Sequence, residues 1–226
     1  MKFYKYMVCL LFAGLAVSCS DDDDKTLQIV PEKTGTFVDE RDGFTYHWVR
    51  IGGLDWAVEN AHYYTDDLTC IIQQGDLHGG DVYYTGISEK YLPRYGYLYT
   101  YEGAQLAVPK GWRIPSDEDW KSLERALGMS ATEVDCLDWR GDRAGELMQQ
   151  EGEGTGLAMV LGGLAEVDSY SYLGCYGFFW TSTVDESKEG DYVFYRKLVY
   201  NMPEVYRQSM KKEGFYISLR FVRDAK

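Results

Sequence analysis

One strongly marked helix followed by several β-type stretches restricts the fold of this chain more than any other feature of its sequence. Ser116 precedes a helix predicted over residues 117–127, and Asp119 completes a variant of the capping box. Gly128 ends the helix. Apolar side chains recur at helical spacing and predict one buried face: Trp120, Leu123 and Leu127.

The C-terminal half of the chain is predicted to be mostly strand, at residues 177–183, 192–200 and 215–223. The last stretch alternates, with an apolar face of Phe215, Ile217, Leu219 and Phe221 opposite Tyr216, Ser218 and Arg220. Other strands are predicted at 44–51 and 55–58, short helices at 100–107 and 143–150, and loops over 65–95. The expected class is α+β, with two or three short helices and antiparallel strands.

The N-terminus has the pattern of a secretion signal that ends at a lipid attachment site. Lys2 and Lys5 precede an apolar run at residues 7–17, which is too short to span a bilayer but suits a signal peptide. The following Ala-Val-Ser-Cys sequence resembles a bacterial lipobox, which implies cleavage before Cys19 and attachment of acyl chains such as palmitate. The alternative is an ordinary secreted protein in which Cys19 is incidental.

The residues that follow Cys19 are acidic. Residues 20–25, Ser-Asp-Asp-Asp-Asp-Lys, are predicted to form a solvated tether because like charges repel. They also resemble the export signal of Bacteroidota-type surface lipoproteins, which implies the outer face of the outer membrane, and they spell an engineered enterokinase site as well. We divide the chain into a signal peptide (1–18), an acidic tether (19–33) and one domain (34–226).

The charge balance disfavours two classes of partner. The 226 residues include 36 acidic and 23 basic side chains, so the net charge is −13. Nucleic acid and anionic lipid surfaces would both be repelled. Contact with a membrane is therefore expected only through the lipid anchor.

The cysteines leave two possibilities open. If Cys9 leaves with the signal and Cys19 carries lipid, an odd number remains: Cys70, Cys136 and Cys175. They are expected either as buried free thiols or as one disulfide from three candidate pairings. Neither they nor the three histidines have the spacing of a zinc site, so we expect no metal and no other cofactor.

Several short blocks follow one another in a recognisable order. They are DGFTY (42–46), VRIGGLDW (49–56), EN (59–60), YGYLYT (95–100), PKGWRIPSDEDW (109–120), AG (144–145), GG (162–163), GFFWTST (177–183) and SLRFVRD (218–224). Over about residues 36–224 the chain resembles the Fibrobacter succinogenes major paralogous domain family. The resemblance implies a C-type lectin-like fold and a secreted or surface lipoprotein with a non-catalytic role.

The chain departs from the family pattern in two places. Where the family often has two cysteines, this sequence has Val108 and Phe221, and we expect an apolar contact in place of a disulfide. The second departure is an added segment rich in glycine and tyrosine at residues 65–91.

A candidate ligand loop lies at residues 164–176, where lectin-like folds carry a long binding loop. Its acidic and aromatic side chains suit recognition of a sugar or peptide: Glu166, Asp168, Tyr170, Tyr172 and Tyr176. The alternative is that Tyr170 and Tyr172 only pack the loop onto the domain. Residues 140–142 spell an Arg-Gly-Asp tripeptide, which we interpret as a charged turn before a helix.

Other candidate sites are weaker. Trp112, Trp120 and Trp180 are expected in the core, and Ser182 has neither a nucleophile-elbow motif nor a nearby histidine. Carboxylates that could bind calcium have no distinctive spacing: Asp66, Asp67, Asp168, Asp185 and Glu186.

The sequence thus predicts a surface-exposed lipoprotein with no enzymatic activity. Its domain would bind a glycan or a protein, or take part in a cell-surface assembly. The alternatives are an enzyme of the sulfatase-modifying type, which would need reactive cysteines, and a purely structural surface protein.

Overall fold

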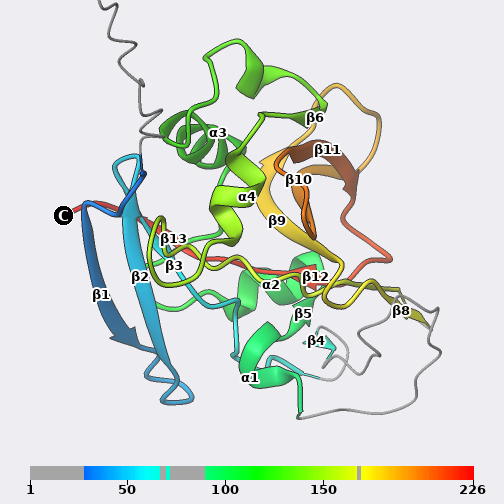
Figure 1. Cartoon of the computed structure of the whole chain (residues 1–226). Helices are drawn as coiled ribbons and strands as arrows, with labels where there is room; N and C mark the ends of the chain where they lie inside the picture. The colour runs from blue at the N-terminus through cyan, green and yellow to red at the C-terminus, as the bar shows by residue number, and fades with distance from the viewer. Residues whose placement is uncertain (1–27, 67–69, 72–89, 167–168) are drawn as a thin grey trace, which may run out of the picture.

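The computed structural model describes residues 28–66, 90–166 and 169–226, together with the backbone of residues 70–71 (Figure 1). The predicted signal peptide, Cys19 and most of the acidic tether lie outside these residues, as does most of the added segment. Within them the fold is α+β and mostly β, as the sequence predicts. No helix in these ranges is long and apolar enough to cross a bilayer.

Strands of the described chain form two main sheets and a small hairpin. The four-stranded sheet has the order β1 (Lys33–Val38), β2 (Thr45–Ile51), β3 (Leu54–Ala57) and β13 (Val222–Asp224). The seven-stranded sheet has the order β4 (Cys70–Ile71), β5 (Leu98–Tyr99), β12 (Ile217–Ser218), β9 (Tyr176–Val184), β10 (Tyr192–Val199), β11 (Val205–Lys211) and β6 (Asp138–Arg140). The hairpin pairs β7 (Leu164–Glu166) with β8 (Ser169–Ser171). These strand pairs are antiparallel except for β12 with β9.

The helices confirm the three predicted ones and add a short one. They are α1 (Leu92–Tyr95), α2 (Tyr101–Ala107), α3 (Asp117–Ala126) and α4 (Ala144–Gln149), with a 3₁₀ turn at Glu133–Asp135. The capping box of α3 forms as predicted: Ser116 Oγ accepts from the Asp119 amide at 3.1 Å, and Asp119 Oδ2 accepts from the Ser116 amide at 2.6 Å. Arg113 pairs with the Asp119 carboxylate from outside the helix.

The core lies between the two sheets, where α3 and α4 pack (Figure 1). Trp120 of α3 is fully buried, 5.1 Å from the Trp56 ring of β3 and 5.8 Å from the Phe179 ring of β9. Trp112 and Trp180 are also buried, as predicted. A second cluster contains Phe221, with Val108 packed against it, so both positions of the missing disulfide are apolar core.

The closing strand was predicted wrongly as one continuous element over residues 215–223. The structure divides it into β12 and β13, which belong to different sheets, with residues 219–221 between them. Figure 1 shows this red segment crossing from one sheet to the other. The predicted polar face is also wrong, because Ser218 and Arg220 are fully buried.

Arg220 lies between the two strands, and its side chain is bound by several parts of the chain. Its guanidinium donates to backbone carbonyls of Ala57, Leu157 and Ala158 at 2.7–3.0 Å and to Asn60 Oδ1 at 2.7 Å. These acceptors come from two separate segments of the chain, so no single neighbouring strand could supply all of them. A buried cation of this kind is tolerated only when its hydrogen bonds are satisfied.

Candidate functional site

A row of aromatic side chains crosses one face of the seven-stranded sheet. Lys197 on β10 stands directly opposite Phe178 on β9 and opposite Tyr206 on β11, and Tyr206 stands opposite Trp139 on β6. Cross-strand partners on one face lie within side-chain contact. Their registers therefore place these four side chains in a line across four strands.

The exposed end of this row is tightly ordered by ring and cation contacts. The Trp139 and Tyr206 rings are 5.0 Å apart, and Lys197 Nζ lies 3.9 Å from the Tyr206 centroid and 4.9 Å from that of Trp139. Trp139 is 39% exposed. Partial burial lowers the pKa of Lys197, although the nearby Asp138 carboxylate opposes this shift. The ammonium group thus faces the rings and holds them in place.

The predicted ligand loop supplies the other end of the row. Tyr172 and Tyr176 have ring centroids 4.7 Å apart, and Tyr176 lies 6.2 Å from Phe178 in an edge-to-face contact. Tyr172 is 45% exposed and its backbone lies in the left-handed region, at φ +70°. Tyr195 continues the row, 6.1 Å from both Phe178 and Tyr206.

The structure does not bring all five predicted loop residues together. Tyr170 is buried and donates to the Gly162 carbonyl at 2.6 Å, so it packs the hairpin onto the domain. Glu166 is exposed at the end of β7, and Asp168 lies outside the described residues. Only Tyr172 and Tyr176 belong to the aromatic row.

The sequence did not indicate Trp139, Tyr195, Lys197 or Tyr206 as site residues. Strands β6 and β11 were not predicted, because the inward side chains of β11 include Arg207 and a serine whereas Tyr206 points outward. This inverts the usual alternation of apolar inside and polar outside.

A cavity of about 750 Å³ opens beside the same loop. Its walls come from α1, α4, the segment 159–161 and the turn between β10 and β11. The volume is within the range typical of small-molecule sites. Apolar side chains contribute to the lining: Met159, Val160, Leu161, Met202 and Pro203. Planar polar or aromatic side chains contribute the rest: Arg94, Tyr95, Glu146, Gln149, Gln150, Glu151, Tyr200 and Asn201.

Some polar side chains of the cavity already have ion-pair or hydrogen-bond partners within the protein. Arg94 pairs with Glu151 at 2.9 Å, and Gln149 Nε2 donates to the carbonyls of Gly145 and Val199, which fixes its amide plane. Because both bonds use the Gln149 nitrogen, its oxygen is left as an acceptor. Tyr200 is 64% exposed, the largest exposure among the large hydrophobic side chains of the described residues.

Close backbone packing sets the position of α4 in the cavity wall. The Gly145 amide donates to the Pro203 carbonyl at 2.7 Å, and a Cβ at Gly145 would lie 2.2 Å from the Glu204 carbonyl oxygen. Only glycine allows this approach. It explains the Ala-Gly block of the sequence and holds Glu146 and Pro203 on adjacent walls.

The turn at residues 172–176 connects the cavity with the aromatic row. Gly174 lines the cavity, whereas Tyr172 and Tyr176 begin the row. The Cys175 carbonyl accepts from the Tyr200 amide at 2.9 Å, which fixes the turn against the cavity rim. The turn therefore contributes to both features, although the row lies on the face of the sheet opposite to the one that α3 and α4 cover.

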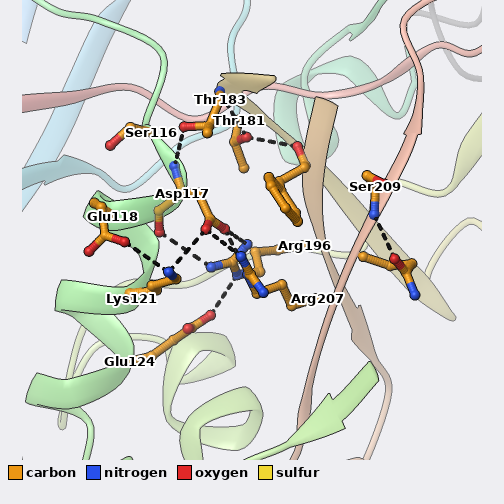
Figure 2. Close-up of polar contacts among 12 residues, drawn as sticks. Ser116, Asp117, Glu118, Lys121, Glu124, Thr181, Thr183, Arg196, Arg207 and Ser209 are labelled. Atoms are coloured by element: carbon orange, nitrogen blue, oxygen red, sulfur yellow. Dashed lines mark hydrogen bonds and ion pairs between the residues drawn. The ribbon is translucent and has the colours of Figure 1, made fainter. Parts of the chain in front are cut away.

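The densest charged cluster of the described chain is structural (Figure 2). Asp117 accepts from Arg196 at 2.7 Å and from Arg207 at 2.7–2.9 Å. Glu124 accepts from Arg196 at 2.7 Å and from Arg140 at 2.6 Å. All five side chains are buried, so these charges join α3 to β10, β11 and β6 rather than facing a ligand.

This buried cluster shows how the Arg-Gly-Asp tripeptide at residues 140–142 is to be interpreted. Arg140 is 5% exposed and bound to Glu124, so it is not available to a partner. The predicted turn precedes α4, but its arginine belongs to β6 and the core.

The cysteines and acidic residues are dispersed. Cys136 and Cys175 are free thiols, and Cys136 is exposed, contrary to the expectation of burial, because it follows the 3₁₀ turn on the surface. The Cys70 side chain lies outside the described residues. Asp185 accepts from Ser187 and Ser209, and within the described residues no three His, Cys, Asp or Glu side chains cluster as metal ligands.

Three comparisons with known proteins were made. No curated protein and no solved structure matched the chain. The family model described as the Fibrobacter succinogenes major domain matches residues 49–223, well over half of the sequence. This range includes the capped helix, the seven-stranded sheet, the aromatic row and the cavity, whereas β1 and most of β2 precede it. The chain therefore belongs to the Fibrobacter succinogenes major domain family.

Proposed function

We propose that this protein is a lipid-anchored, surface-exposed recognition protein whose domain binds a glycan in the cavity beside α4. The anchor is proposed from the sequence around Cys19, and the outer face of the outer membrane from the acidic residues behind it. The domain is proposed to be non-catalytic and C-type lectin-like. The family resemblance supports this fold, and the pairing of β13 with β3, which joins distant parts of the domain, is compatible with it.

The observation that carries the glycan proposal is the chemistry of the cavity lining. Glu146 and Gln149 supply acceptors, Asn201 supplies both a donor and an acceptor, and Arg94 supplies donors. Planar groups of this kind pair with the adjacent hydroxyls of a sugar, while the exposed Tyr200 ring can stack on its apolar C–H face. The apolar part of the lining then excludes water from the bound ligand.

A glycan array with purified full-length protein in detergent tests the proposal. We expect binding that is lost in Tyr200→Ala and weakened at least about tenfold, or roughly 1.4 kcal/mol, in Glu146→Gln. Matched controls are Tyr64→Ala, which removes another exposed tyrosine, and Glu102→Gln, which neutralises an exposed carboxylate on α2. Arrays with and without calcium show whether a metal takes part. Binding by none of the glycans, or equal binding by Tyr200→Ala, would contradict the glycan site.

The anchor is tested independently. Labelled palmitate should be incorporated by cells that express the parent chain and not by cells that express Cys19→Ala. Protease added to intact cells should digest the parent protein. Incorporation that persists in Cys19→Ala, or protection of the parent protein from protease, would refute this part of the proposal.

A further inference from the structure

The lining of the cavity beside α4 carries an uncompensated negative charge. It includes one basic and two acidic side chains, Arg94, Glu146 and Glu151, so its formal net charge is −1. Arg94 donates to Glu151 at 2.9 Å, and these two charges offset each other. The Glu146 side chain forms no ion pair or hydrogen bond within the part of the chain that the structure describes, and Arg143, one turn before it, does not line the cavity. Glu146 is therefore the charge that a ligand meets.

A second acceptor lies beside this carboxylate. Gln149 follows Glu146 by three residues on α4, and both side chains lie away from the buried face of the helix. Gln149 Nε2 donates to the carbonyls of Gly145 and Val199 at 3.0 and 3.2 Å. Both amide hydrogens are used in this way, so the Gln149 Oε1 atom is left to accept from a ligand. The cavity thus presents a charged and a neutral acceptor next to each other.

We propose that the glycan bound in this cavity carries a free amino group, so that the ligand contains a hexosamine whose ammonium group is held by Glu146 and Gln149. An ammonium group has three hydrogens to donate and no acceptor, which matches two adjacent acceptors. Its charge compensates that of the lining, and hydrogen bonds between charged groups are stronger than neutral ones. The inference rests on the proposed glycan function and names its substrate class.

Two further features favour an ammonium group over its alternatives. The Tyr200 ring, which is 64% exposed, lines the same cavity, and the face of an aromatic ring attracts cations. The net charge of the protein, −13, attracts cationic sugars at long range and repels acidic ones such as uronic acids. A sugar with a hydroxyl or an acetylated nitrogen at the same position would leave the charge of Glu146 uncompensated.

Matched sugars that differ in one substituent test the inference. The probes are the methyl glycosides of glucosamine, galactosamine and mannosamine, each with two counterparts in which the amine is replaced by a hydroxyl or carries an acetyl group. Ligand-observed NMR titration of the purified full-length protein in detergent gives the dissociation constants. At least one amine should bind about tenfold more tightly than both of its counterparts, a difference of roughly 1.4 kcal/mol. Added salt should reduce this difference because it screens the two charges.

Variants assign the preference to a residue. Glu146→Gln keeps the size of the side chain and an acceptor oxygen but removes the charge, so the preference for the amine should fall from about tenfold to less than about twofold. The matched control is Glu153→Gln, which removes an exposed carboxylate from the adjacent loop, outside the lining. It changes the net charge of the protein by the same amount and should keep the preference. Near-ultraviolet circular dichroism shows that both variants are folded.

Four results would overturn the inference. Equal affinity for an amine and its hydroxyl counterpart, or no binding of any probe while the glycan array is positive, would refute the amino sugar and leave the cavity as a glycan site. A preference that persists in Glu146→Gln would refute the role of this carboxylate. Binding of a lysine-containing dipeptide as tight as that of the best amino sugar would assign the site to peptide amines. A negative glycan array together with no binding of the probes would refute the proposed function as well.

Discussion

Removal of the charge on Glu124 should destabilise the fold strongly. Glu124 is fully buried and its two oxygens accept from Arg140 at 2.6 Å and from Arg196 at 2.7 Å. In Glu124→Gln both guanidinium groups remain buried with a neutral partner. Loss of one member of a buried ion pair costs about 3–5 kcal/mol. At about 2–4 °C per kcal/mol for a domain of this size, the melting temperature should fall by about 6–20 °C.

Differential scanning calorimetry measures this change, and urea unfolding followed by tryptophan fluorescence gives the free energy independently. The matched control is Glu118→Gln, which also removes a helix carboxylate but one that is 70% exposed and paired with Lys121. An exposed pair contributes about 0–1 kcal/mol, so this control should melt close to the parent. If Glu124→Gln and Glu118→Gln melted at the same temperature, the reasoning about the buried cluster would be refuted.

Three further predictions concern the same domain. Burial alone would raise the pKa of Asp117, but Arg207 and Arg196 outweigh it and hold that pKa below its ordinary value of 3.8; the stability that this gives is present above pH 3.8 and is lost as the pH falls, so urea midpoints of the parent should fall more steeply towards acid than those of Asp117→Asn. Gly145→Ala places a Cβ against the neighbouring backbone, and calorimetry should show a loss of about 1–3 kcal/mol. Tyr170→Phe removes a buried hydrogen bond and should cost about 0.5–1.5 kcal/mol in urea unfolding, without any change in glycan binding.

Local signals in the sequence were sufficient to predict α2, α3 and α4, whereas α1 falls in a segment that was predicted as loops. Ser116 and Asp119 cap α3 through contacts three residues apart, and the apolar spacing of its buried face is also local. Strands β9 and β10 were also predicted, as stretches rich in residues that favour strands, whereas the one stretch with a clear alternation, 215–223, proved to be two strands. Sequence patterns of this kind depend on contacts between residues that are close together in the chain.

The remaining elements depend on partners that are distant in the sequence. Arg207 on β11 points inward because Asp117 lies there, 90 residues earlier in the chain. Arg220, between β12 and β13, is buried because carbonyls of residues 57, 157 and 158 accept hydrogen bonds from it. The sequence alone does not show whether an arginine is buried or exposed, and only the tertiary structure distinguishes the two cases.

Only part of the candidate site was predicted from the sequence. Tyr172 and Tyr176 were identified because they share one short loop, and they proved to be neighbours. Trp139 and Tyr206 meet them only through strand registers across the sheet, which the sequence does not display. The cavity, assembled from α1, α4 and two loops, had no contiguous signal at all.

The split closing segment has a consequence for how the chain matures. Strand β12 fills an interior position of the seven-stranded sheet, between β5 and β9, and β13 completes the other sheet beside β3. Every other named strand precedes these two in the chain. The seven-stranded sheet therefore lacks an interior strand, and the other sheet an edge strand, until residues 217–224 are available, and such sequence-distant pairings form slowly. Folding of the domain should therefore be completed only when almost the whole chain, up to residue 224, is available.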